Sequence, residues 1–202
     1  MLITTIIAGC TQFVNTRLRA DDSGLLSAPL SQAQKTNDLF VFFNFEPIGK
    51  KSLSDGSSVI SFKPTGDAFR ALVTLEATTA ADGTIQKLHL IIARSFIDDS
   101  AKCVYAADLA KSFLLNAAAT SDGDEVTSLA REIEARAMAR FSGTVIATSV
   151  PQTSATPSTS YRIYAGNSGS SLIPYKSGWN LLLHNDMQVT DRNLELTVAH
   201  QP

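Results

Sequence analysis

The cysteine at position 10 stands in the sequence context that most clearly predicts chemistry. A short apolar run, Leu2–Ala8, ends in the small pair Ala8-Gly9 directly before Cys10, and the chain turns polar at Thr11. The second cysteine is Cys103, and no Cys-x-x-Cys motif occurs. Two cysteines do not make a disulfide framework, so each has to be interpreted from its own surroundings.

The four residues Ile7-Ala8-Gly9-Cys10 resemble the lipobox that ends a bacterial lipoprotein signal. The resemblance implies a lipid on Cys10 and a folded body in the periplasm, anchored to the outer membrane. A complete secretory signal begins with a basic region, followed by an apolar region of about 7–15 residues. Because no basic residue precedes Cys10, two interpretations stay open. Met1 lies inside a longer signal, or residues 2–8 form a β-strand, which Ile and Thr favour.

The interpretation of Cys103 depends on that of Cys10. If Cys10 carries a lipid, Cys103 has no partner within the chain. We then expect a buried structural thiol, the usual state of a free cysteine. The alternative is a disulfide between the two residues in an oxidising compartment.

One serine lies in a pattern that suggests nucleophilic catalysis. The segment Gly166-Asn167-Ser168-Gly169-Ser170 resembles the nucleophile loop of trypsin-like serine proteases, where Gly-x-Ser-Gly places an activated serine beside backbone N–H donors. A catalytic triad also needs a base and an orienting carboxylate. The only upstream histidine, His89, lacks the small-residue motif of that family. We therefore expect a Gly/Ser loop over 166–178 and keep a serine hydrolase using Ser168 as an alternative function.

The histidines and carboxylates do not gather at spacings that hold a metal ion. His89, His184 and His200 have no second His or Cys two or four residues away. The acidic clusters at 98–99 and 122–125 precede segments with helical periodicity, where helix N-capping explains them. The glycines do not form a phosphate-binding loop. The sequence therefore predicts neither a metal nor a cofactor.

Aromatic residues concentrate in one C-terminal segment, and we consider it the candidate partner surface. Exposed aromatic side chains are enriched at protein interfaces. The alternative is that these rings face the core at the edges of a sheet. The four residues are Tyr161, Tyr164, Tyr175 and Trp179.

Composition indicates an ordinary globular domain. The chain has 202 residues, of which 44% are hydrophobic and 18% charged, enough for one domain with a core. Seventeen basic residues against nineteen acidic ones give a net charge of −2. This balance argues against nucleic acid as a partner, because such binders usually carry an excess of basic residues. After Cys10, no apolar run approaches the roughly 20 residues that a membrane-spanning helix needs.

Hydrophobic patterning predicts strands in the first half of the chain. The segment 39–45 is rich in Phe and Val and indicates a central buried strand. A second strand is expected at 59–62. Alternating patterns over 70–78 and 84–97, joined by Asp82-Gly83, predict a β-hairpin.

Two amphipathic helices are expected next, over 98–119 and from about 124 to 141. Further strands are predicted at 144–149, 161–165, 181–184 and 194–198, with a mobile Pro-containing loop at 150–160. Strands, then helices, then strands predict an α+β domain: an antiparallel sheet with two consecutive helices packed on one face.

The predicted organisation has three parts. Residues 1–10 form a truncated signal-like segment, 11–38 a tether, and 39–202 a single α+β domain. The function we favour is a non-enzymatic, lipid-anchored protein of the envelope that acts as an assembly or binding module. Its expected partners are the membrane, through the lipid on Cys10, and an envelope protein. Besides the hydrolase, a cytoplasmic or phage-encoded structural protein with residues 1–10 as a strand is the remaining alternative.

Overall fold

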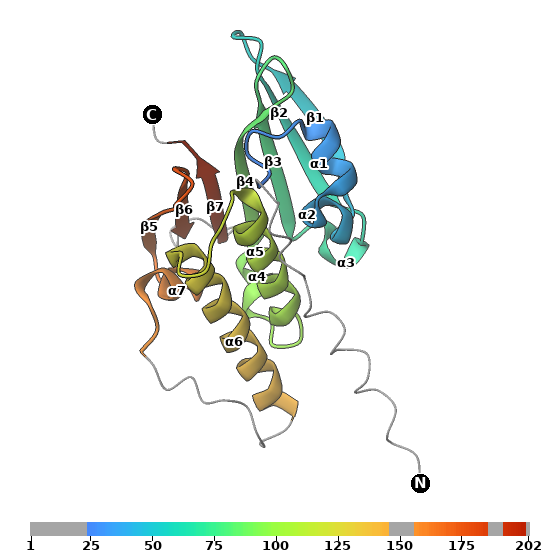
Figure 1. Cartoon of the computed structure of the whole chain (residues 1–202). Coiled ribbons are helices and arrows are strands. Elements are labelled where there is room, and N and C mark those ends of the chain that lie inside the picture. Colours follow the sequence, from blue (N-terminus) through green and yellow to red (C-terminus); the bar gives the residue numbers. More distant parts are fainter. Residues whose placement is uncertain (1–23, 146–155, 186–191, 201–202) are drawn as a thin grey trace.

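The computed structural model describes residues 24–145, 156–185 and 192–200, and its strands form one antiparallel sheet (Figure 1). In the described residues the strand order is β1-β2-β3-β4-β7-β6-β5, so β1 and β5 are the edges. The strands are β1 (Phe45–Ser52), β2 (Ser58–Pro64), β3 (Val73–Thr79), β4 (Ile85–Ala93), β5 (Gly169–Pro174), β6 (Asn180–Asn185) and β7 (Asn193–Ala199). The helices are α1 (Leu30–Thr36), α2 (Asp38–Phe42), α3 (Asp67–Arg70), α4 (Arg94–Asp98), α5 (Cys103–Ala117), α6 (Glu125–Val145) and α7 (Thr159–Tyr164).

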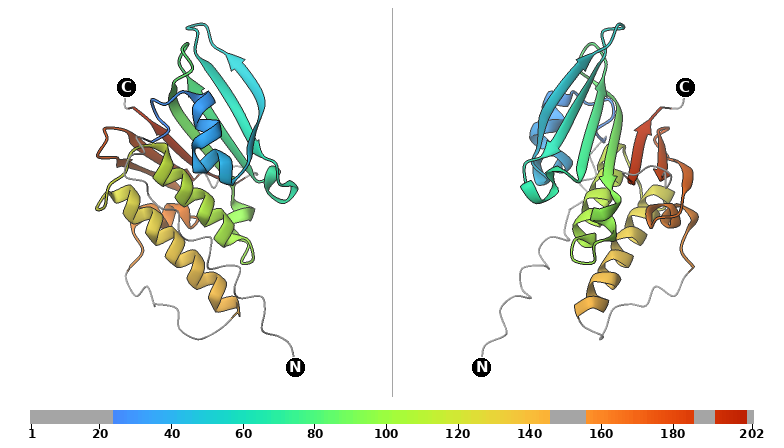
Figure 2. Two further views of the ribbon diagram at one scale, coloured as in Figure 1. Left: turned by 45° about the vertical axis from the view of Figure 1, so that its right-hand side comes forward. Right: turned by 180° about the vertical axis from the view of Figure 1, so that it is seen from behind.

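The core lies between one face of the sheet and the helices. Side chains alternate across a strand, and in β3, β4 and β7 every second residue is fully or almost fully buried. The paired helices α5 and α6 bury a face rich in Ala and Leu against these strands, and α1, α2 and α7 extend the same layer (Figure 2). The predicted fold class, an antiparallel sheet with two consecutive helices on one face, is confirmed. Among the helices within the described ranges, none combines the length and apolarity required to cross a bilayer.

The β3–β4 hairpin forms as predicted. Gly83 adopts a positive φ of 86°, which glycine accommodates without steric cost. The Asp82 carboxylate accepts a hydrogen bond from the Thr84 backbone N–H at 2.9 Å. The turn sets the register that places Glu76 opposite His89.

The predicted central strand over 39–45 is wrong. Most of this segment is α2, because the side chain of Asn37 caps the helix by accepting a hydrogen bond from the Leu39 N–H at 2.9 Å. Asn44 adopts a positive φ of 48°, and the chain then turns into β1 at Phe45. Polar residues at both ends therefore determine a helix, although the Phe and Val residues between them favour a strand.

The described part of the predicted tether packs onto the body. The N–H groups of Leu25 and Leu26 donate to the carbonyl oxygens of Asn116 and Ala117, and both leucine side chains are buried. Residues 30–36 form α1. The domain therefore begins before residue 39, while residues 1–10, with Cys10, and 11–23 lie outside the described residues.

Two further segments differ from expectation. The predicted strand at 161–165 is helix α7, because the Ser158 hydroxyl accepts a hydrogen bond from the Tyr161 N–H at 3.1 Å and caps the helix. The predicted loop at 166–178 contains β5, which pairs with β6 over its whole length. The predicted strand at 144–149 begins inside α6, and the rest of it falls outside the described ranges, as does most of the 150–160 loop.

Candidate functional site

The sheet has a second face that no helix of the described residues covers, and we call it the open face. On this face the side chains of β3, β4 and β7 are partly exposed, whereas those of the alternate positions are buried against the helices. The right-hand view of Figure 2 shows the sheet from behind, with strands in front of the helices. The open face is therefore a surface built from the regular backbone of the sheet.

A row of polar side chains crosses the centre of the open face. The Ser61 hydroxyl donates to Glu76 Oε1 at 3.2 Å. His89 stands between two carboxylates: its Nδ1 lies 3.4 Å from Glu76 Oε2 and its Nε2 lies 3.4 Å from Glu195 Oε2. Both contacts are longer than ordinary N–H···O hydrogen bonds. Together with the Ser61 hydrogen bond, they connect four neighbouring strands, β2, β3, β4 and β7.

The polar row continues to the sheet edge at β5. His184 on β6 lies directly opposite Glu195 in the strand register, and Ser170 lies directly opposite His184. A hydrogen bond of 2.7 Å joins Ser170 Oγ to His184 Nδ1. We call the six residues from six neighbouring strands the polar row: Ser61, Glu76, His89, Glu195, His184 and Ser170.

Two leucines lie beside the β5 end of the polar row. Leu172 and Leu182 face each other across β5 and β6. Their exposed fractions are 54% and 41%, unusually high for leucine in a regular strand. This end of the open face therefore combines hydroxyl, imidazole and exposed aliphatic groups.

Within 24–145, 156–185 and 192–200, the His, Cys, Asp and Glu side chains make no group of three or more suited to a metal ion. The acidic clusters considered in the sequence make local contacts instead. Asp99 accepts from the Ala101 N–H at 2.9 Å, and Asp124 accepts from the Ser121 N–H at 2.8 Å.

Ser168 is exposed in the turn before β5, outside the polar row. In the described part of the chain its hydroxyl makes no hydrogen bond with a histidine or carboxylate. The serine that does contact a histidine is Ser170, two residues further along. The orienting carboxylate of a triad is not assembled, because Glu195 contacts His89 rather than His184.

The four aromatic residues predicted as a partner surface lie mainly in the core, which corrects that interpretation. Tyr164, Tyr175 and Trp179 are buried. The Tyr175 hydroxyl donates to the Leu114 carbonyl at 3.0 Å, and burial raises the pKa of this phenol above its usual range. Tyr161 is partly exposed and lies under the Arg136 guanidinium, 4.9 Å from the ring centre. These rings join helices to the sheet and leave little aromatic surface for a partner.

Cys103 is a free, buried thiol at the start of α5. Its Sγ lies 3.4 Å from the Ser100 carbonyl oxygen, and burial raises the pKa of the thiol. A raised pKa disfavours the reactive thiolate. The residue therefore has the surroundings of a structural cysteine.

Comparisons with protein-family models, with curated proteins and with solved structures found no match. The chemistry of the open face consequently has to be interpreted from this molecule alone.

The polar row was missed in the sequence because its members come from distant strands. One signal was available: a turn at Asp82-Gly83 places Glu76 opposite His89 on one face. The contributions of Glu195 and His184 depend on β7 pairing with both β4 and β6, and no local pattern predicts that pairing.

Proposed function

We propose that the protein is a non-enzymatic, lipid-anchored envelope protein that acts as a binding or assembly module through the open face of its sheet. The anchor is a lipid on Cys10, proposed from the lipobox-like sequence before it. The observation that supports a binding role is the one-sided sheet. Its uncovered face carries the polar row and two exposed leucines on a rigid framework.

Fixed side chains make the open face suitable for recognition. The contacts of Ser61, His89 and Ser170 restrict rotamers before a partner arrives. Binding then costs less side-chain entropy than it would on a surface of free, flexible side chains. Carboxylates near the centre and leucines near β5 offer a partner both charge and apolar contact.

The lipid anchor is tested by membrane fractionation and mass spectrometry in a bacterial envelope. We expect Cys10→Ser to release the protein from the membrane fraction and to remove a diacylglyceryl-type mass from the native N-terminus. The matched control is Cys103→Ala, which changes the buried thiol and leaves membrane association intact. An unmodified Met1, or a Cys10→Ser protein that stays in the membrane fraction, contradicts the anchor.

The binding face is tested by site-specific photocrosslinking. A photoreactive residue at Thr197, opposite both His89 and Leu182 on the open face, is expected to form a discrete protein adduct in envelopes. The same residue at Arg131, exposed on α6 across the helix layer, is the control and is expected to give none. Adducts at Arg131 without adducts at Thr197 would assign binding to the helix layer instead.

A second candidate function is a hydrolase with Ser170 as nucleophile, favoured by the hydrogen bond to His184. In this mechanism His184 Nδ1 accepts the hydroxyl proton while Oγ attacks an acyl carbon. A fluorophosphonate probe would then label the protein and its Ser168→Ala variant, but not Ser170→Ala. We expect no labelling of any of the three, because Glu195 is engaged with His89.

A further inference from the structure

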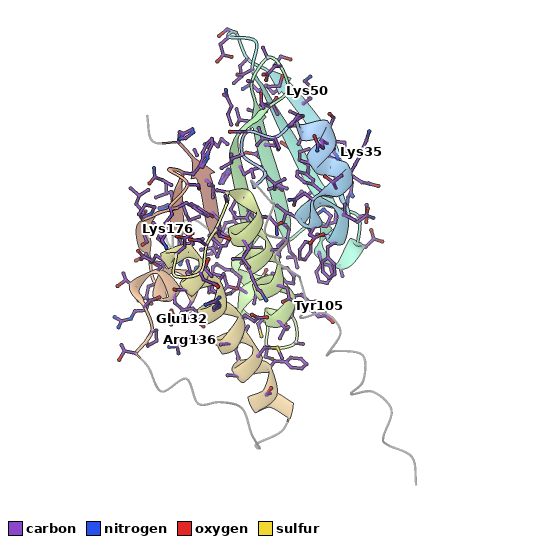
Figure 3. All side chains as sticks on the ribbon, viewed as in Figure 1. Lys35, Lys50, Tyr105, Glu132, Arg136 and Lys176 are labelled. Carbon is purple, nitrogen blue, oxygen red and sulfur yellow. The ribbon has the colours of Figure 1, made fainter. Side chains whose placement is uncertain are left out.

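The two edge strands of the sheet differ in how they resist pairing with another chain. An edge strand offers unpaired N–H and C=O groups, and proteins protect such edges with charged residues, proline and bulges. Strand β1 has all three: Lys50 and Lys51, Pro47, and an irregular register between Pro47 and Gly49. Lys50 lies near the far end of the β1–β2 hairpin (Figure 3).

Strand β5 has almost none of this protection. Its sequence, Gly-Ser-Ser-Leu-Ile-Pro, contains no charged residue, and its register with β6 is regular from Gly169 to Pro174. Only Pro174, at the last position, lacks an N–H donor. Helix α7 packs against the face of β5 on the helix side of the sheet, where Ser160 Oγ lies 3.0 Å from Ser171 Oγ. Strand β5 is the edge strand at the end of the sheet opposite β1 (Figure 1). Among the described residues no strand pairs with the outer edge of β5, and five of its six residues carry a backbone N–H.

We infer that β5 is a self-association site, at which it pairs antiparallel with β5 of a second copy about a two-fold axis at Leu172. In this register Leu172 lies opposite Leu172 of the other copy, as symmetry requires for an isologous contact. Directly opposed side chains on one face lie about 4.5–5.5 Å apart at Cβ. Within each copy, Leu182 lies opposite Leu172 on the neighbouring strand. The pairing therefore places four leucines in a row across the axis, Leu172 and Leu182 from each copy.

Charge decides in favour of a second copy at β5 rather than at β1. Two β5 edges approach each other without like charges, whereas two β1 edges would bring four lysines together. The pairing also joins the open faces of the two copies into one surface, with the leucines at its centre. This inference stands on the β5 edge itself and does not depend on the lipid anchor.

The strength of the contact follows from its size. A pair of six-residue strands buries less than the roughly 1,200–2,000 Å² typical of stable complexes. We therefore expect a concentration-dependent equilibrium between one and two copies of the 21.6 kDa chain.

Sedimentation velocity over a dilution series tests the inference, using the full chain with Cys10→Ser to exclude lipid and disulfide effects. Leu172→Lys places like charges on the axis and is expected to weaken association by about tenfold or more. Ile48→Lys changes an equally exposed side chain on β1 and is expected to leave association unchanged. A monomer at all concentrations, or a dimer unaffected by Leu172→Lys, overturns the proposal.

Oxidative crosslinking then tests the register. Leu172→Cys in the same background is expected to form a covalent dimer, because directly opposed residues in neighbouring strands lie within disulfide distance. Ile48→Cys is the matched control and is expected to remain monomeric under the same oxidation. If Leu172→Cys crosslinks no faster than Ile48→Cys, the two copies do not meet at this position. Crosslinking to another envelope protein instead would assign β5 to an extended segment of a different partner.

Discussion

Strands β1 and β5 end the same sheet, yet different interactions hold their ends. Near β1, the ring centroids of Phe40 and Phe62 lie 5.2 Å apart, and Phe45 packs beside Phe40. Apolar packing therefore joins α2 to the strands. Near β5, polar contacts contribute as well. The Tyr175 hydroxyl donates to the Leu114 carbonyl, and Lys176 Nζ lies 3.6 Å from Oδ1 of the buried Asp124. Lys176 appears beside the α5–α6 connection in Figure 3.

The comparison teaches that both ends of the sheet are packed but differ in the polarity of their contacts. The β1 end has a phenylalanine cluster and a shielded edge, whereas the β5 end adds a hydrogen bond and an ion pair to its buried aromatic rings and has an unshielded edge. Mutations at the β1 end should therefore cost mainly packing energy. Mutations at the β5 end should cost hydrogen-bond energy and respond to pH.

The largest effect is expected from Phe40→Ala at the β1 end. Phe40 is buried, and removing its ring leaves a cavity among Phe45 and Phe62. We expect a loss of about 3–5 kcal/mol in the free energy of unfolding, measured by urea titration. Phe42→Ala, on the exposed side of the same helix, is the control and should cost far less. Equal losses in the two variants would show that α2 does not pack as described.

Tyr175→Phe is expected to have a smaller effect and to alter the response to alkaline pH. Removing the hydroxyl leaves the Leu114 carbonyl without its donor, at a cost of about 1–3 kcal/mol. Burial raises the pKa of Tyr175 in the folded state, whereas the unfolded phenol ionises near pH 10. Stability should therefore be intact below about pH 10 and fall above it.

Thermal melts between neutral pH and about pH 11 check this prediction. The melting temperature of the wild type should fall above about pH 10, and that of Tyr175→Phe should fall by less. Burial also raises the pKa of Tyr164, so some dependence on pH remains in the variant. Tyr105→Phe, at an exposed position, is the control and should follow the wild type. An unchanged alkaline slope in Tyr175→Phe would mean that Tyr175 is not buried.

Ser158→Ala should have a moderate effect localised to the helix beneath β5. Its hydroxyl caps α7 and also donates to Glu132 Oε2 at 2.6 Å. Loss of an N-cap costs about 1 kcal/mol. Thr159→Ala, at the neighbouring exposed position, is the control. Hydrogen exchange of the α7 amides should rise in Ser158→Ala alone.

The Glu132 contact adds an acid response to the same helix. Burial raises the pKa of Glu132, but hydrogen bonds from Ser158 and Arg136 outweigh it and hold the pKa below its usual range. Figure 3 shows Glu132 and Arg136 together on α6. Stability from these contacts is present above the unfolded pKa, near 4.3, and is lost as pH falls through the folded value. The acid-induced loss should be smaller in Ser158→Ala.

The smallest effect is expected from Ser170→Ala on the open face. Its hydrogen bond to His184 is exposed, and exposed polar contacts contribute within about 0.5 kcal/mol. Ser168→Ala, in the preceding turn, is the control, and both variants should unfold at nearly the same urea concentration. A loss above about 1 kcal/mol in Ser170→Ala would show that the polar row stabilises the β5 end.

Much of the fold could be predicted because its strongest patterns are local. Alternation over 73–79 and 85–93, the Asp82-Gly83 turn and the amphipathic pattern of α6 each depend on neighbouring residues. The errors arose where capping overrides composition: Asn37 makes a helix of a Phe-rich segment, and Ser158 makes one of residues 159–164. Side-chain caps of this kind give a weaker signal than hydrophobic periodicity.

The candidate site was harder to predict for a topological reason. His89 and His184 are almost a hundred residues apart. His89 gains Glu76 through the local hairpin, whereas Glu195 lies between the two histidines only because β7 inserts between β4 and β6. No spacing rule relates residues that are joined through two such strand pairings, β4 with β7 and β7 with β6. Sequence reasoning therefore found the anchor candidate, Cys10, and missed the surface that we propose it presents.

The insertion of β7 also constrains the order of folding during synthesis. Strand β4 emerges from the ribosome long before β7, with α4, α5, α6, α7, β5 and β6 in between. Until β7 arrives, the first four strands end in an unpaired nine-residue edge at β4 that carries Leu88, Leu90 and Ile92. An exposed apolar edge of this kind promotes aggregation. Strand β7, the C-terminal strand of the described residues, thus closes the middle of the sheet, so a chain that stops before residue 193 is expected to be a substrate for chaperones and proteases.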